Sequence, residues 1–145
     1  MTDPFELPIT TETAEIAHDA VFAKWVRELG LRDMEVSDGY ATAVLPQNPD
    51  LQFFSGAVCG QAIMAAIDSV VTLAMLTADR PTKGTASQNT QFLRPASNDD
   101  LRVTTTVLRF GSTIAYAETR VTFEGKGELV AHATSEFIFG PHTRP

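Results

Sequence analysis

The longest apolar stretch of the chain is residues 53–78, FFSGAVCGQAIMAAIDSVVTLAMLTA. From residue 62 onward the apolar residues fall on every side of a helix, which predicts a helix over residues 56–78 that is buried all round. Asp68 is the one charged residue in this stretch. An ionised carboxylate in an apolar core is costly unless it is paired or hydrogen-bonded. Asp68 is therefore the first candidate functional residue.

Weaker patterns of alternating apolar and polar residues precede and follow this helix in the sequence. A helical pattern runs from Thr11 or Thr13 to about residue 29, where Gly30 is a plausible stop. Residues 34–45 alternate as a strand does, with a turn or bulge at residues 37–39. Four further strands, bounded by turn-forming residues, are predicted at residues 83–94, 101–110, 113–123 and 129–139. Because short links join antiparallel neighbours, most of the sheet should be antiparallel.

This order of elements predicts the fold class. A helix, a strand, a long helix and then four strands favour an α+β protein in which a curved antiparallel sheet wraps the long helix. A chain of 145 residues is the size of one domain. We therefore expect residues 1–145 to form a single domain, with residues 1–30 as an N-terminal extension that carries a helix.

Composition narrows the function classes. The formal net charge of −7 argues against a nucleic-acid-binding protein, which usually presents a basic face. The single cysteine cannot form an internal disulfide, which fits a reducing compartment. Residues 1–10 show no signal-peptide pattern, and residues 62–78 are short for a membrane span and interrupted by polar residues. We expect a cytoplasmic protein that binds neither nucleic acid nor membranes.

Two short motifs give the chain a family resemblance. The predicted central helix opens with Gly56-x-x-Cys59-Gly60-Gln61, and the next strand ends in Phe92-Leu93-Arg94-Pro95-Ala96. Together with Asp68, these segments resemble the hotdog-fold acyl-CoA thioesterases, in particular the phenylacetic-acid-degradation (PaaI-like) group. Residues 58–63 also resemble the corresponding helix of the TesB-like thioesterases. The resemblance covers roughly residues 34–140 and implies the hotdog fold.

The resemblance also implies site residues. The PaaI-like group carries G-x-x-H-G-G with an Asp nine residues after the His, and here Cys59 takes the His place and Asp68 the Asp place. It implies Asp68, Gly60 and Thr85 as the catalytic residues, Thr85 because it lies seven residues before Phe92. Two departures stand out: Phe53 replaces an Asn of the PaaI-like site, and Ser135 matches the TesB-like Gln.

These residue types meet the chemical requirements of thioester hydrolysis. A thiol with a pKa of about 8.5 leaves readily as thiolate, so no strong acid is needed at the leaving group. Backbone N–H groups at a helix start, from Gly60 alone or from Gly60 together with Gln61, would stabilise the oxyanion. Asp68 would serve as general base or as nucleophile. Eight residues of helix separate Gly60 from Asp68 by about 12 Å, so one carbonyl cannot reach both within one chain, and the active form should be at least a two-fold dimer.

Further residues are candidates for lining the substrate site: Gln61, Cys59, Phe53, Phe54 and Ser87. Each also has a purely structural interpretation, as do Asp68, through a hydrogen bond to Ser69, Thr72 or Thr85, and Thr85, as a residue that favours strands. The three histidines, His18, His132 and His142, have no metal-site spacing. No cofactor or metal is expected.

The leading hypothesis is an acyl-CoA thioesterase that takes an acyl- or aryl-CoA as substrate and self-associates as a dimer or as a pair of dimers. One alternative is a non-catalytic acyl-CoA-binding protein of the same fold. A less favoured alternative is a hotdog hydratase or dehydratase, because that chemistry requires a His close to an acid and the sequence places no His near the central helix.

Overall fold

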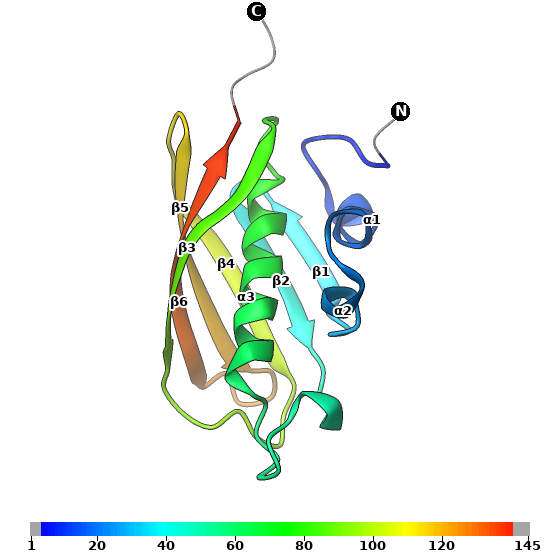
Figure 1. The fold of residues 1–145 in the computed structure, drawn as a ribbon, viewed down its shortest axis with the longest axis vertical. Coiled ribbons are helices and arrows are strands. Elements are labelled where there is room, and N and C mark those ends of the chain that lie inside the picture. Colours follow the sequence, from blue (N-terminus) through cyan, green and yellow to red (C-terminus); the bar gives the residue numbers. More distant parts are fainter. Residues whose placement is uncertain (1–3, 141–145) are drawn as a thin grey trace, which may run out of the picture.

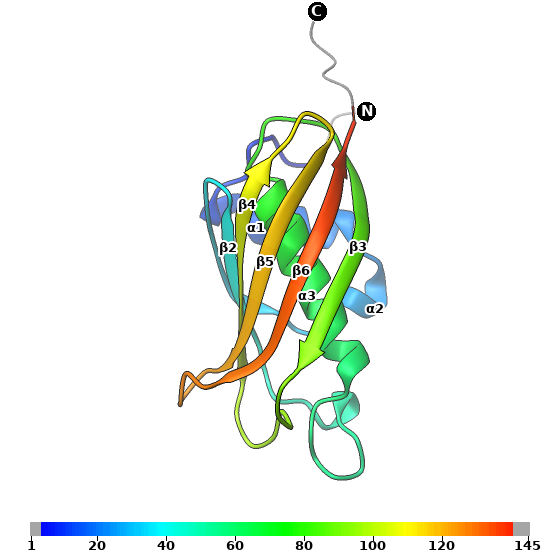
Figure 2. The same ribbon diagram turned by 90° about the vertical axis from the view of Figure 1, so that its left-hand side faces the viewer.

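The structure, a computed structural model, describes residues 4–140. Its main element is one antiparallel sheet with the strand order β1-β2-β4-β5-β6-β3, which Figure 2 shows from the face that lies away from the long helix. The strands are β1 (Arg32–Ser37), β2 (Tyr40–Leu45), β3 (Thr82–Phe92), β4 (Leu101–Phe110), β5 (Ile114–Phe123) and β6 (Leu129–Phe139).

The helices lie on one face of this sheet. The long helix α3 (Gly60–Met75) crosses the middle of the sheet, and α1 (Thr11–Val21) and α2 (Lys24–Arg27) lie beside it, over the β1 and β2 side (Figure 1). A short 3-10 helix, η1 (Pro49–Leu51), lies on the way from β2 to α3. This arrangement confirms the predicted α+β fold with an antiparallel sheet around a central helix.

Most predicted elements are present with shifted ends. The alternating residues 34–45 form a hairpin of two strands, because Gly39 turns the chain with a φ of +66°. The N-terminal helical pattern is broken at Phe22 and Ala23, both of which have extended backbone. The central helix begins at Gly60 rather than at residue 56, because Val58 still pairs with Gln52 in an isolated bridge.

The core lies between α3 and the sheet. It includes Ile67, Leu73 and Met75 from the helix and Val103 and Phe137 from the strands, all almost fully buried. The expectation that the central helix is buried all round is wrong, since Gln61 and Met64 are exposed and Asp68 is half-buried. These residues are spaced by three and four along the helix and form one stripe on its surface.

The strand β3 is an edge of the sheet. It pairs only with β6 among the described strands, so its other side has no neighbour within residues 4–140. Residues 84–92 of this strand contain no charged residue and no proline, although such residues are common on edges that stay unpaired. None of the helices that the structure describes is long and apolar enough to cross a membrane.

Candidate active site

The half-buried carboxylate of Asp68 is held by the edge strand. The Thr85 hydroxyl of β3 donates a hydrogen bond to Asp68 Oδ1 at 2.5 Å. The neighbouring hydroxyls of Ser69 and Thr72 instead donate to helix carbonyls, those of Ala65 and Asp68. Within residues 4–140, Thr85 is thus the side-chain hydrogen-bond partner of the carboxylate, and Oδ2 is left for another donor. The structure brings together two of the three predicted catalytic residues.

The helix α3 and the strand β3 run antiparallel and side by side along this stripe. The Phe92 ring lies over Gly60, at 3.2 Å from the place where a Gly60 Cβ would be. Farther along, Gln88 Nε2 donates a hydrogen bond to the Met64 carbonyl at 3.3 Å, and the Thr90 hydroxyl donates one to Gln88 Oε1 at 2.6 Å. Neither Gln88 nor Thr90 was predicted from the sequence, although their even spacing from Phe92 could have placed them on the same strand face.

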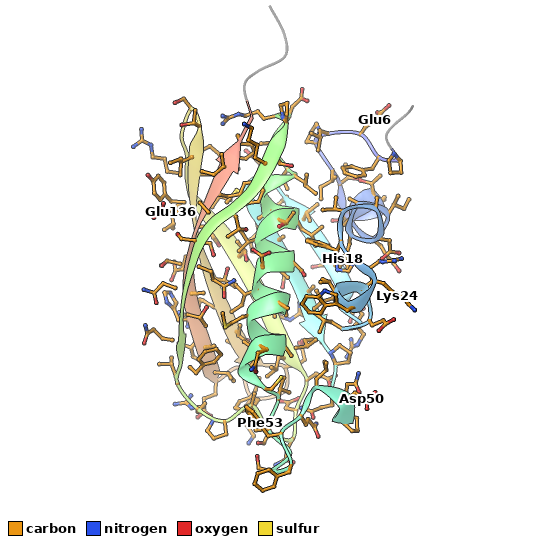
Figure 3. The ribbon with its side chains drawn as sticks, in the orientation of Figure 1. Glu6, His18, Lys24, Asp50, Phe53 and Glu136 are labelled. Atoms are coloured by element: carbon orange, nitrogen blue, oxygen red, sulfur yellow. The ribbon has the colours of Figure 1, made fainter. Side chains whose placement is uncertain are left out.

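A bulge in β3 corrects the interpretation of Ser87. The register between β3 and β6 shifts between Thr85 and Ser87, so that Thr85 pairs with buried Phe137 and Ser87 pairs with exposed Glu136. Glu136 lies on the sheet face away from α3 (Figure 3). Ser87 therefore belongs to the outer face, and the expectation that it lines the substrate site beside Thr85 is wrong.

The first turn of α3 offers backbone donors. Cys59 is the N-cap residue, with extended backbone and no side-chain hydrogen bond into the helix. The N–H groups of the next three residues, Gly60, Gln61 and Ala62, have no acceptor within the helix because they precede its first i to i−4 bond. They lie at the positive end of the helix dipole, where a developing oxyanion is stabilised.

Two cavities flank this first turn, at the end of the molecule where Phe53 and Asp50 are labelled in Figure 3. The first, which we call the Phe92 cavity, has a volume of about 630 Å³ and is lined by Phe53, Ser55, Ala57, Val58, Gly60, Ile63, Phe92, Leu93, Arg94, Pro95 and Ala96. The second, the Trp25 cavity, has a volume of about 370 Å³ and is lined by Trp25, Glu28, Leu29, Asn48, Asp50, Leu51, Cys59, Gln61 and Ala62.

The predicted lining residues divide between these cavities. Phe53 lines the Phe92 cavity, whereas Cys59 and Gln61 line the Trp25 cavity. Phe54 is fully exposed and lines neither of them. The structure gives no support for Phe54 as part of an acyl channel.

Asp68 and the helix start do not meet within one chain. Both Gly60 and Asp68 lie on the continuous helix α3, where eight residues span about 12 Å. A thioester carbonyl in contact with the Gly60 N–H is therefore out of reach of the same chain's Asp68.

The described histidines take no part in this site. His18 is buried on α1, which packs against α3, but its Nε2 has no hydrogen-bond partner and its Nδ1 lies 3.3 Å from the Asp19 carboxylate. His132 pairs with Glu118 at 2.7 Å, and His142 lies outside the described residues. Within residues 4–140 no cluster of three His, Cys, Asp or Glu side chains is placed to hold a metal.

Comparison with known proteins identifies relatives with related descriptions. The family model described as "Acyl-CoA thioesterase N-terminal domain" matches residues 45–138. A provisionally named esterase of Thermoplasma volcanium, TV1331, is 28% identical over 104 residues, covering 71% of this chain and 77% of that protein.

Solved structures agree at the level of the fold. Zebrafish thioesterase superfamily member 2 is similar with a TM-score of 0.78 and 18% identity, covering 94% of this chain and 99% of that one. The Escherichia coli PaaI protein from the phenylacetic acid degradation operon is similar with a TM-score of 0.73 and 18% identity, covering 88% and 94%. The fold, the family match and these relatives together confirm the predicted resemblance: the chain belongs to the acyl-CoA thioesterase family of hotdog-fold proteins.

Proposed function

We propose that this protein hydrolyses an acyl-CoA thioester to the free acid and CoA. The observation that carries the proposal is the hydrogen bond from Thr85 to Asp68 at 2.5 Å, on the same helix whose first turn leaves backbone N–H groups without acceptors. The hydrogen bond fixes the direction of the carboxylate and leaves its second oxygen available for a water molecule. Family membership supports the class of reaction.

In the proposed reaction, Asp68 acts as a general base. It takes a proton from a water molecule whose oxygen attacks the thioester carbonyl carbon. The carbonyl oxygen becomes an oxyanion that accepts a hydrogen bond from Gly60 N–H. The C–S bond then breaks, and CoA leaves as thiolate. Direct attack by Asp68 is the alternative, and it would pass through a mixed anhydride that water hydrolyses.

The site requires two chains. Because Gly60 and Asp68 are about 12 Å apart along one helix, a carbonyl at Gly60 would meet the Asp68 of a partner chain. Two features support such a dimer: the unpaired edge of β3 and the exposed stripe of α3 beside it. Pairing of β3 with its copy would extend the sheet and set the two α3 helices antiparallel, each bringing Asp68 to the start of the other.

This dimer makes Met64 the central contact. If Gly60 of one antiparallel helix faces Asp68 of the other, the two-fold axis passes midway, near Met64, which is 41% exposed in the single chain. Met64→Arg would place two like charges on the axis, at a cost of several kcal/mol, or on the order of a hundredfold or more in dimer affinity. We expect a monomer by analytical ultracentrifugation, with loss of thiol release. Met64→Leu should remain a dimer, and an active dimeric Met64→Arg would contradict the arrangement.

The function itself is tested by free-thiol release from aryl-CoAs and straight-chain acyl-CoAs. Wild type is compared with Gly60→Pro and Gly60→Ala. Proline is tolerated at the first helical position, and the extended backbone of Cys59 suits a residue that precedes proline. Gly60→Pro removes the N–H, and its kcat should fall by about 10²- to 10³-fold. Gly60→Ala brings a similar Cβ toward Phe92 but keeps the N–H, so it should retain most of the activity.

Two results would count against the proposal. If wild type releases thiol from no member of the panel yet binds acyl-CoA, the protein is a non-catalytic acyl-CoA-binding relative. If Gly60→Pro and Gly60→Ala lose activity equally, the added Cβ is responsible and the oxyanion assignment fails.

A further inference from the structure

The two cavities beside the start of α3 match the two arms of a thioester. The acyl group and the sulfur leave the carbonyl carbon in different directions, so a carbonyl held at Gly60 N–H sends one arm to each side of the first helical turn. Gly60 itself lines the Phe92 cavity, and the adjoining Cys59 and Gln61 line the Trp25 cavity. The assignment of the arms rests on the proposed hydrolysis, because that places the carbonyl at Gly60.

Charge distinguishes the two cavities. CoA carries several phosphate charges, which favour a cationic rim. Arg94 lines the Phe92 cavity, where it is 40% exposed, donates to the Leu129 carbonyl and lies 3.5 Å from the exposed Glu128 carboxylate, a surface pair that is worth little. The Trp25 cavity is lined by two carboxylates, Glu28 and Asp50, and by no Lys or Arg.

The carboxylates of the Trp25 cavity are only weakly compensated. Glu28 forms a solvent-exposed pair with Lys24 at 3.7 Å, which is worth little. No cation is paired with Asp50 among the described residues. An anionic arm would therefore be disfavoured in this cavity, whereas an apolar arm would meet Trp25, Leu29 and Leu51.

We propose that the Trp25 cavity receives the acyl group and that the Phe92 cavity lies on the CoA side. The acyl group is then uncharged and apolar, aliphatic or aryl, because the Glu28 and Asp50 carboxylates repel a second carboxylate at its far end. A volume of about 370 Å³ is within the range of small-molecule sites. Trp25 and Asp50 are the residues that determine specificity, through contact area and through charge respectively.

The chain contains its own probes for this cavity. Trp25 is the only tryptophan and Cys59 the only cysteine, and both line it. We would add three ligands to the wild-type protein: the non-hydrolysable thioether octyl-CoA, a thioether whose octyl chain ends in a carboxylate, and CoA alone. The readouts are tryptophan fluorescence, the rate of Cys59 labelling by a thiol reagent, and binding by calorimetry.

Octyl-CoA should change the Trp25 emission and slow Cys59 labelling at least several-fold, whereas CoA alone should do neither while still binding. The carboxylate-ended thioether should bind about tenfold more weakly than octyl-CoA. The assignment is overturned if CoA alone protects Cys59 as well as octyl-CoA does, if octyl-CoA binds with neither readout changing, or if octyl-CoA does not bind.

Variants separate this assignment from the proposed function. Trp25→Ala, at an exposed position, should lower kcat/KM for octanoyl-CoA about tenfold relative to acetyl-CoA. Asp50→Asn should raise kcat/KM for an acyl-CoA ending in a carboxylate several-fold, and Glu35→Gln, an exposed carboxylate on β1 outside both cavities, should not. If these variants hydrolyse thioesters with the same preference among acyl groups as wild type, the assignment of the acyl group to the Trp25 cavity is overturned, but the proposed hydrolysis stands. If octyl-CoA changes the Trp25 fluorescence and the Cys59 labelling rate but no acyl-CoA is hydrolysed, the proposed hydrolysis is overturned, but the acyl assignment stands.

Discussion

Replacement of Asp68 by asparagine is expected to lower kcat for thioester hydrolysis by about 10²- to 10⁴-fold, the usual contribution of a positioned general base. The amide is not basic at neutral pH, so it cannot take the proton of the attacking water. Its Oδ1 still accepts a hydrogen bond from Thr85, as Asp68 Oδ1 does at 2.5 Å. The fold should therefore survive, and the thermal melting temperature should change by only a few degrees. Steady-state thiol release and a melting curve measure the two effects.

The hydroxyl of Thr85 provides a graded comparison. Thr85→Ser keeps a donor for Asp68 and should keep most of the activity. Thr85→Val removes the donor at nearly constant volume and should lower kcat by about tenfold or more, since hydrogen bonds to charged groups contribute about 1.5–3 kcal/mol. Full activity in Asp68→Asn would instead make this carboxylate structural. Equal losses in Thr85→Ser and Thr85→Val would show that packing of the threonine methyl, not the hydrogen bond, is what matters.

Mixing two inactive variants is expected to restore activity. In a dimer of Asp68→Asn with Gly60→Pro, one site receives both defects and the other combines an intact Gly60 N–H with an intact Asp68. Random exchange of subunits makes half of the dimers mixed, and each has one working site of two, so recovery should reach about a quarter of the wild-type rate under two-fold symmetry. Thiol release after unfolding and refolding the mixture, or after co-expression with two tags, measures this.

The same mixture without exchange is the control. The two proteins combined at low temperature, immediately before assay, should show only the sum of their residual activities. Met64→Arg/Asp68→Asn mixed with Met64→Arg/Gly60→Pro should also fail, because each chain then brings a like charge to the two-fold axis. A site contained in one chain predicts no recovery under any of these conditions, and that result would remove the need for a dimer.

Several parts of the fold follow from local patterns. The strands at residues 101–110 and 129–139 match β4 and β6 to the residue, because alternating apolar positions bounded by turn residues define strand ends well. The hairpin β1–β2 and the break between α1 and α2 were less clear, because each depends on one or two residues whose backbone leaves the local pattern, such as Gly39 and Ala23.

The candidate site was predicted only in part. Asp68 was identifiable as a lone charge in an apolar helix, and its contact with Thr85 came from the family resemblance, not from any local pattern. Ser87 was misplaced because alternation assumes an unbroken strand, and a bulge between Thr85 and Ser87 moves every residue after it to the other face. Gln88 joins the α3 side of the sheet for the same reason.

Residue types and their spacing were enough to predict the long helix and the four later strands, to show that Asp68 requires a partner, and to show that Gly60 and Asp68 are too far apart on one helix to act together. These properties depend on residue type and helical spacing, which are local. The position of β3 at the sheet edge beside α3, and the cavity that Trp25, Asp50 and Cys59 line together, became visible only in the folded chain. Strand order and cavity walls join residues far apart along the chain, and their contacts depend on how the α3 helix packs on the whole sheet.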